Sequence, residues 1–349
     1  MDVYDSMAIK ENMVTRIGIN GFGRIGRQVL RAAIERYSDK LEIVGVNTPA
    51  STEINAHIFK YDSSYGIYPG QVGLYDNGIV VDGKEIKFLS ASNPKDIPWG
   101  DLGVDIVIES TGKFTDASKA YGHIESGSKK VIISAPAKGE DIMVVLGVNE
   151  NEYDPNDHHV LSNASCTTNC IAPMVSVLHQ NFGVKRGLMS TVHAYTNDQR
   201  ILDGSHNDLR RARSAAQNII PTTTGAARSV GVILPELEGK IHGIALRVPV
   251  PTGSLTDFVA ELNKNVTVDD VNRVFRDAAE GSLKGILEYT EDPIVSHDIV
   301  ANTHSCIFDS LSTIVMDGNM VKILGWYDNE WGYACRTIDL CAFLIDKGL

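Results

Sequence analysis

The chain has 349 residues, of which 43% are hydrophobic and 22% charged, so it is long enough for two domains with ordinary globular cores. Its 44 acidic and 32 basic side chains give a net charge of −12, which disfavours generic binding to nucleic acid or to a membrane surface. No apolar run approaches the roughly 18 residues of a membrane span, and the start has no signal core. The 5 cysteines are an odd number on a long chain, which argues against a disulfide framework and favours a reducing cytoplasm.

The first part of the chain alternates strands with helices. Residues 1–12 are polar and precede the first strand, so we expect a flexible leader or an added extension there. Apolar patterns predict strands at 14–20, 41–47, 104–109 and 130–134, with helices at 24–37 and near 116–126. This alternation is typical of right-handed βαβ units and predicts a parallel sheet.

The pattern changes after residue 165. A helix at 171–182 and a strand at 187–193 precede a long polar stretch, 195–217. Strands follow at 241–250, 255–262, 305–308, 313–316 and 321–327, with one strong helix at 268–280. We therefore predict an α/β Rossmann-type nucleotide-binding domain over 13–165 and an α+β catalytic domain with a mainly antiparallel sheet over 166–330. The helical residues 331–349 are expected to pack back on the first domain.

Residues 21–26 read Gly-Phe-Gly-Arg-Ile-Gly, between the first strand and the first helix. In this context Gly21 permits the tight turn, Gly23 lets the backbone approach a pyrophosphate, and Gly26 lets helix and strand pack closely. The pattern indicates a dinucleotide site rather than a structural glycine turn. The second strand ends Asn47-Thr48 and lacks the acid that usually binds the ribose of NAD, which leaves room for NADP. The alternative is that Asn47 and Thr48 serve NAD without an acid.

Residues 162–170, Ser-Asn-Ala-Ser-Cys-Thr-Thr-Asn-Cys, have the composition of a helix start. Cys166 would lie near the helix N-terminus, which favours a thiolate nucleophile over a merely buried thiol. His193 ends a predicted strand and could serve as its base, although an isolated histidine there is more often structural. Cys170 and His179 match no standard zinc spacing with Cys166, so we expect no metal.

Residues 209–213 carry three arginines in an otherwise acidic chain. Such a cluster is compatible with a solvated face or a nucleic-acid patch. A local site for phosphate or carboxylate is the more specific interpretation, because guanidinium groups bind these anions through two parallel hydrogen bonds.

Taken together, these motifs resemble those of phosphorylating glyceraldehyde-3-phosphate dehydrogenases over residues 14–349. The matching stretches are 18–27, 162–170, 191–200, 221–227, 247–249 and 326–330. The resemblance implies that Cys166 attacks an aldehyde, that His193 takes the proton, and that phosphate attacks the resulting thioester. It implies a homotetramer, with glyceraldehyde 3-phosphate and inorganic phosphate as substrates.

The resemblance also implies binding roles for particular residues. Substrate phosphate would be held by Thr196 and Arg247, and inorganic phosphate mainly by Ser165, Thr167, Arg211, Thr224 and Gly225. The cofactor would contact Arg24, Ile25, Ser134, Asn329 and Tyr333. Two departures bear on cofactor choice: Thr48 stands where the NAD-dependent enzymes carry an acid, and Gly204-Ser205 stands where they carry Leu-Pro. Both predict a cofactor site that accepts NAD but prefers NADP, which would suit carbon fixation or gluconeogenesis more than glycolysis.

Three alternative functions are compatible with part of these motifs. An erythrose-4-phosphate dehydrogenase would share the cysteine and histidine, but the intact stretch 221–227 favours phosphorolysis. A non-catalytic binding protein on this fold would not need Cys166, His193, Arg211 and Arg247. A Cys–His hydrolase would leave the glycine motif and Asn329 without a role.

Overall fold

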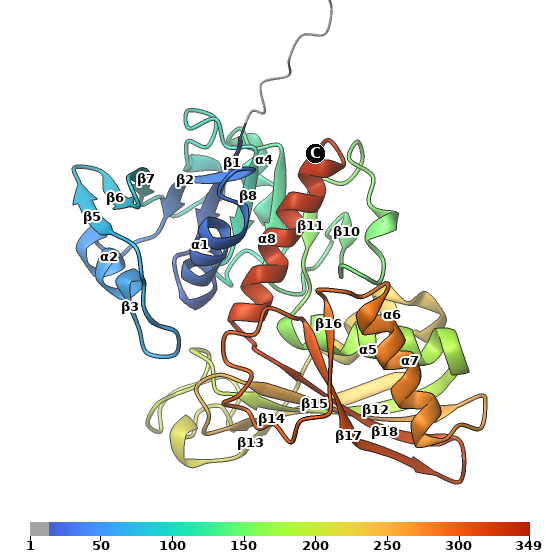
Figure 1. The fold of residues 1–349 in the computed structure, drawn as a ribbon. Helices are drawn as coiled ribbons and strands as arrows, with labels where there is room; N and C mark the ends of the chain where they lie inside the picture. Colours follow the sequence, from blue (N-terminus) through green and yellow to red (C-terminus); the bar gives the residue numbers. More distant parts are fainter. Residues whose placement is uncertain (1–13) are drawn as a thin grey trace, which may run out of the picture.

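The structure is a computed structural model, and it describes residues 14–349 (Figure 1). The predicted leader, residues 1–12, lies outside the described residues. The chain forms two large sheets, each with its own hydrophobic core. No helix among the described residues is both long and apolar enough to cross a bilayer.

The first sheet has nine strands in the order β10-β11-β9-β8-β1-β2-β7-β6-β5. Its parallel part consists of β1 (Thr15–Asn20), β2 (Leu41–Asn47), β7 (Lys84–Leu89), β8 (Ile106–Glu109), β9 (Lys130–Ile133), β10 (Ile142–Met143) and β11 (Val160–Ser162). The antiparallel edge consists of β5 (Val72–Tyr75) and β6 (Gly78–Val81). The associated helices are α1 (Arg24–Tyr37), α2 (Thr52–Lys60), α3 (Ala117–Ala120) and α4 (Gly122–Glu125). Strand order reverses at β1, and ligands of such sheets bind beyond the carboxyl ends of the strands at that point.

The second sheet has seven strands in the order β13-β14-β12-β15-β18-β17-β16. Its strands are β12 (Val184–Ala194), β13 (Ile220–Thr222), β14 (Ile241–Val248), β15 (Ser254–Leu262), β16 (Leu287–Thr290), β17 (Cys306–Met316) and β18 (Met320–Tyr327). Four of its six pairings are antiparallel, and only β12–β14 and β16–β17 are parallel. The core of this part also contains side chains of α5 (Cys166–Phe182), α6 (Ala226–Ile233) and α7 (Val268–Glu280). The predicted fold class, a Rossmann-type domain plus an α+β domain with a mainly antiparallel sheet, is confirmed.

Short elements complete the chain: β3 (Tyr61–Asp62), β4 (Gly66–Ile67) and the 3₁₀ turns Pro94–Asp96, Glu150–Glu152, Ala215–Gln217 and Pro235–Leu237. The last helix, α8 (Trp331–Asp346), lies beside α1 in Figure 1. Its Ala334 and Ile338 belong to the same buried cluster as Ile17 and Val29 of the first sheet and α1. The C-terminal helix therefore contributes to the first core, although it follows the second sheet in sequence.

Several predicted boundaries are wrong. α5 begins at Cys166 instead of residue 171, because Ser165 caps it and the small polar residues form its first turn. The predicted strands 305–308 and 313–316 form the single strand β17, whose register shifts between Asp309 and Ile314. The helix predicted near 116–126 is divided into α3 and α4, which meet at Tyr121.

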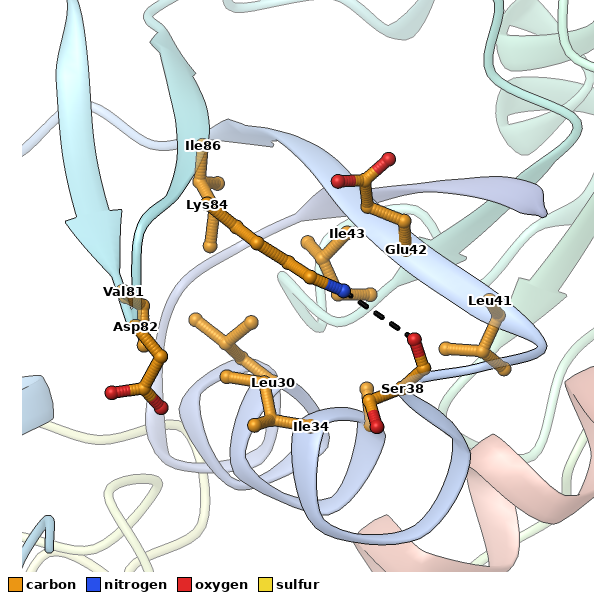
Figure 2. Close-up of a pocket in the computed structure, with 11 residues that line it drawn as sticks. Leu30, Ile34, Ser38, Leu41, Glu42, Ile43, Val81, Asp82, Lys84 and Ile86 are labelled. Carbon is orange, nitrogen blue, oxygen red and sulfur yellow. Dashed lines mark hydrogen bonds between the residues drawn. The ribbon is translucent and has the colours of Figure 1, made fainter. Parts of the chain in front are cut away.

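A cavity of about 250 Å³ lies between α1, β2 and the β6–β7 hairpin (Figure 2). Apolar side chains such as Leu30, Ile43 and Ile86 line it, and the Lys84 ammonium donates to the Ser38 carbonyl across it at 3.4 Å. Its β2 lining, residues 41–43, comes from the amino end of the strand. The cavity is therefore distinct from the glycine turn, which follows the carboxyl end of β1.

Candidate active site

Cys166 is the first residue of α5. The hydroxyl of Ser165, at the N-cap, accepts a hydrogen bond from the Thr168 N–H at 3.0 Å. Ala164 before it has a positive φ of 53°, a strained conformation for a residue other than glycine. The Tyr333 hydroxyl donates to the Ala164 carbonyl at 2.9 Å and helps to hold this turn. The turn places Cys166, a residue of intermediate exposure, at the helix start, as predicted.

The thiol of Cys166 faces His193, with 3.5 Å between Sγ and Nε2. His193 lies near the end of β12, is only 5% exposed, and packs edge-on against the Tyr327 ring. Its Nδ1 lies 2.6 Å from the Ala194 carbonyl and 2.6 Å from Nη1 of Arg247. The carbonyl requires a hydrogen on Nδ1, whereas the guanidinium requires a lone pair there, so the two contacts compete.

Burial controls the charge of this pair. Burial raises the pKa of the Cys166 thiol to about 11, although the positive charge of Arg247 and hydrogen bonds from Thr167 oppose the rise. Burial also lowers the pKa of His193 to about 3, the charge of Arg247 lowers it further, and the Ala194 carbonyl opposes the fall. At neutral pH this arrangement favours a thiol and a neutral imidazole. Burial therefore opposes the thiolate that the helix terminus favours, and the expected thiolate stays a prediction.

Arg247 lies beside the pair, and Arg211 lies within electrostatic reach of Arg247. Arg247 on β14 is the register partner of His193 on β12. Arg211 donates from Nε to the Thr222 hydroxyl at 2.8 Å and forms an ion pair with Asp198. The positive charge of Arg211 contributes to the lowered pKa of Arg247, whose main cause is burial. The structure thus places the two guanidinium groups within electrostatic reach of each other, and that of Arg247 within reach of Cys166.

The remaining predicted phosphate ligands differ in the hydrogen bonds that they form within the protein. Thr196 follows β12, and its N–H donates to Gln199 Oε1 at 3.2 Å. The Thr224 hydroxyl accepts from the Ala226 N–H at 3.2 Å, next to Gly225, the N-cap of α6. Thr167 differs from these, because it is buried and its hydroxyl pairs with the Tyr327 hydroxyl at 2.8 Å.

The glycine turn has the geometry of a dinucleotide site. Gly21 has a φ of 99°, and an added Cβ would lie 2.6 Å from the Thr111 nitrogen. A Cβ on Gly26 would lie 2.2 Å from the Gly21 carbonyl oxygen, so the helix approaches the turn too closely for any side chain. A Cβ on Gly23 would meet nothing within 4 Å, and Gly23 caps α1 with no side-chain hydrogen bond and no acid in the first turn. The N–H groups at the start of α1 therefore have no side-chain cap, and they suit a pyrophosphate.

Arg24 and Ile25 follow this turn. The Arg24 guanidinium bonds to both Asp62 and Glu330, so it links the start of α1 to the segment that carries Asn329. Ile25 is partly buried against the first core. Ser134 follows β9, and its N–H donates to the Glu109 carbonyl at 2.9 Å.

The amide of Asn47 is fully engaged within the protein. Its Nδ2 donates to Asn20 Oδ1 at 2.8 Å and to the Ala91 carbonyl at 3.0 Å, and its Oδ1 accepts from the Ala91 N–H at 2.8 Å. Asn47 therefore organises the end of β2 and has no free amide hydrogen. Thr48, the next residue, bonds through its N–H to the Leu89 carbonyl at 2.9 Å.

Asn329, which follows β18, has its oxygen occupied and its nitrogen available. Its Oδ1 accepts from the Gly253 N–H at 3.1 Å and from the Ser254 hydroxyl at 2.9 Å. Ser205 lies apart from this group, on an exposed loop where its carbonyl accepts from Arg200 Nε at 2.8 Å. Within one chain the structure does not bring Ser205 to the other predicted cofactor residues.

Sequence reasoning missed two buried carboxylates. Glu109 ends β8 and accepts from Asn20 Nδ2, from Nε2 of His123 and from Thr111, so it organises the ends of β1 and β8. Asp328 accepts from Tyr65 and from the N–H groups that open α8. An acid that closes an apolar strand was the available signal for Glu109. Asp328 lies in the matching stretch 326–330, but nothing in that stretch indicates its role. Across residues 14–349, no group of three or more His, Cys, Asp or Glu side chains could hold a metal ion.

Comparisons with known proteins agree with this geometry. Family models described as the NAD binding domain and the C-terminal domain of glyceraldehyde 3-phosphate dehydrogenase match residues 15–117 and 165–329. A glyceraldehyde-3-phosphate dehydrogenase of Streptomyces coelicolor is 62% identical over 95% of this chain and 99% of its own length. One from Geobacillus stearothermophilus is 56% identical over 97% of this chain and all of its own length. The chain therefore belongs to the glyceraldehyde-3-phosphate dehydrogenase family of oxidoreductases.

Proposed function

We propose that this protein oxidises D-glyceraldehyde 3-phosphate, with inorganic phosphate and NAD(P)⁺, to 1,3-bisphosphoglycerate, in a reversible reaction. The observation that carries the proposal is the contact of 3.5 Å between Cys166 Sγ and His193 Nε2 at the start of a helix, beside Arg247. A sulfur nucleophile, a base and cationic side chains in one site are what thioester formation from a phosphorylated aldehyde requires.

In the proposed reaction the Cys166 sulfur attacks the aldehyde carbon while its proton passes to Nε2 of His193. The lone pair on Nε2 requires the tautomer with hydrogen on Nδ1, bonded to the Ala194 carbonyl. Arg247 would then leave Nδ1 and turn its guanidinium toward the substrate phosphate. His193 returns its proton to the oxygen of the tetrahedral adduct and removes one again as the hydride departs, which leaves a Cys166 thioester.

Inorganic phosphate then attacks the thioester carbonyl, which releases the acyl phosphate and frees the Cys166 sulfur. We assign Arg247 and Thr196 to the substrate phosphate, and Arg211, Ser165, Thr224 and Gly225 to the inorganic phosphate. Thr167 supports the site through Tyr327, because its hydroxyl already pairs with that phenol.

The dinucleotide, when bound, supplies the hydride acceptor. The open space at Gly23 and the uncapped start of α1 suit its pyrophosphate, and the free Nδ2 of Asn329 suits its carboxamide carbonyl. We assign Arg24, Ile25, Ser134 and Tyr333 to the same site. NADP is the proposed preference, because Thr48 lacks the charge that would repel a 2′-phosphate. Ser205 would serve the site of a neighbouring copy.

Steady-state kinetics with glyceraldehyde 3-phosphate test this proposal. We expect turnover that depends on phosphate, with a higher kcat/KM for NADP than for NAD. Turnover without phosphate would indicate hydrolysis of the thioester, and turnover that favours erythrose 4-phosphate would indicate the alternative substrate. A clear preference for NAD would refute only the assignment of Thr48 and Ser205.

A further inference from the structure

Ser254, the first residue of β15, joins two parts of the site through one hydroxyl. It is 1% exposed, and its Oγ donates to Asn329 Oδ1 at 2.9 Å. The same oxygen accepts the Ala194 N–H at 3.1 Å. A serine hydroxyl has one hydrogen to donate and lone pairs to accept with, so both contacts are satisfied at once.

The first contact fixes which end of the Asn329 amide is free. The Gly253 N–H and the Ser254 O–H both donate to Oδ1. A flipped amide would turn its NH₂ group toward these two donors and leave buried groups without partners. Asn329 is only 5% exposed, so water cannot readily replace them. The hydroxyl thereby keeps Nδ2 as the end that faces a ligand.

The second contact fixes the backbone next to His193. The β12–β15 ladder ends at the pair Val192–Leu255, one residue short of Ser254. The Ser254 hydroxyl takes the Ala194 N–H beyond that end, while the carbonyl of Ala194 lies 2.6 Å from His193 Nδ1. Ala194, whose carbonyl contacts the imidazole, is therefore held by Ser254 through its own N–H, in the peptide group that precedes that carbonyl.

We propose that Ser254 is a positioning residue that couples the orientation of Asn329 to that of His193. Through this hydroxyl the group that orients the nicotinamide and the base that serves Cys166 keep a constant relative placement. This inference rests on the proposed function for its meaning. It assigns no contact between Ser254 and substrate or cofactor, since both neighbours of its hydroxyl are protein groups.

The test compares Ser254→Ala with Ser254→Thr, which retains the hydroxyl. Ser310→Ala is the matched control: Ser310 is also buried in the same sheet, with 6% of its surface exposed, and its hydroxyl donates to the Thr290 carbonyl at 2.6 Å. We expect Ser254→Ala to weaken NADP or NAD binding, measured by quenching of protein fluorescence, and to slow hydride transfer, each by about tenfold. Ser254→Thr should recover both to within about threefold, and Ser310→Ala should change only the melting temperature.

The same Ser254→Ala substitution in an Asn329→Ala protein distinguishes positioning through Asn329 from a general loosening of the fold. In Asn329→Ala protein, Ser254→Ala should weaken dinucleotide binding no further, because the amide through which it acts is gone. It should still slow alkylation of Cys166 by iodoacetamide, through Ala194 and His193. If Ser254→Ala weakens binding equally in both backgrounds, the coupling through Asn329 is wrong.

Two outcomes overturn the inference directly. One is Ser254→Ala with binding and hydride-transfer rates within about twofold of the wild type; the other is Ser254→Thr as impaired as Ser254→Ala. If Ser254→Ala does not fold, Ser254→Cys replaces it, since a thiol keeps the shape but is a weak donor. If the wild-type protein binds dinucleotide but does not oxidise the aldehyde, the proposed function fails while the binding assays still decide the role of Ser254.

Discussion

At the scale of single residues, His193 is the side chain on which the proposed proton transfers depend. We expect His193→Asn to lower kcat by roughly a hundredfold to ten-thousandfold, the usual contribution of a positioned base. The matched control is His242→Asn, an exposed histidine on the adjacent strand β14, which should leave kcat unchanged. A loss of less than tenfold in His193→Asn, measured in steady state, would mean that another group accepts the proton.

Thr48 is the residue that tests cofactor choice. In Thr48→Asp protein we expect kcat/KM for NADP to fall at least about tenfold, because the new carboxylate would repel the 2′-phosphate. The value for NAD should stay equal or rise. Thr48→Asn, which adds no charge, is the control and should retain most of the NADP activity. Unchanged kinetics with NADP in Thr48→Asp would show that the 2′-phosphate does not approach this residue.

Some site residues could be predicted from sequence and others could not, for a physical reason. Cys166 and the three glycines lie in short local patterns whose chemistry does not depend on distant residues. The bond between Ser254 and Asn329 joins residues 75 positions apart, and neither has an unusual neighbour in sequence. Likewise, the full engagement of Asn47 depends on Asn20 and Ala91, which only the folded sheet brings near.

At the scale of elements, too, a clear local pattern could be predicted and a weak one could not. α1 begins and ends where the sequence predicts, since the glycine turn opens it and its apolar stripe is regular. The short strands β5 and β7 and the helix α2 were not predicted, because their apolar residues are few and several face solvent. The strand β6 is apolar and mostly buried, but a run of four residues is too short for a clear pattern. The proposed domain boundaries, including those at residues 165 and 330, stay predictions. Contributions from α8 to the first core are consistent with them.

The capping box of α7 provides a test at this scale. The Thr267 hydroxyl accepts from the Asp270 N–H, and the Asp270 carboxylate accepts from the Thr267 N–H and hydroxyl. These hydrogen bonds hold the pKa of Asp270 below its ordinary value. Their contribution to stability is therefore present when the pH is above the pKa of the unfolded state, about 4. It is lost as the pH falls through the lower pKa of the folded state.

We therefore expect Thr267→Ala to lower the urea midpoint at pH 7, and this difference from the wild type to shrink as the pH falls below about 4. Asp269→Asn is the control, because Asp269 lies in the same first turn but outside the capping box. A difference that stays constant down to acidic pH would show that the Asp270 carboxylate does not contribute to the cap.

At the scale of the whole molecule, one face of the second sheet exposes large apolar side chains. Leu188 on β12 is 67% exposed and Ile244 on the neighbouring β14 is 50% exposed. Such a surface favours association with another protein surface, and we propose that it contacts a second copy within a homotetramer. Leu188→Glu combined with Ile244→Glu should reduce the molar mass measured by light scattering.

Ile54→Glu is the control for that experiment, because Ile54 is similarly exposed on α2 of the first domain. It should leave the molar mass unchanged. If the double variant keeps the wild-type mass, these two side chains do not lie in a subunit contact.

The central claim is that oxidation proceeds through a thioester on Cys166, and a rapid-mixing experiment without phosphate tests it most directly. Mixing the protein with NADP and glyceraldehyde 3-phosphate should give a burst of about one reduced cofactor per active site, followed by slow turnover that phosphate accelerates. Cys166→Ser should give no burst while still binding dinucleotide. A full burst in Cys166→Ser, or rapid steady turnover of the wild type without phosphate, would contradict the account.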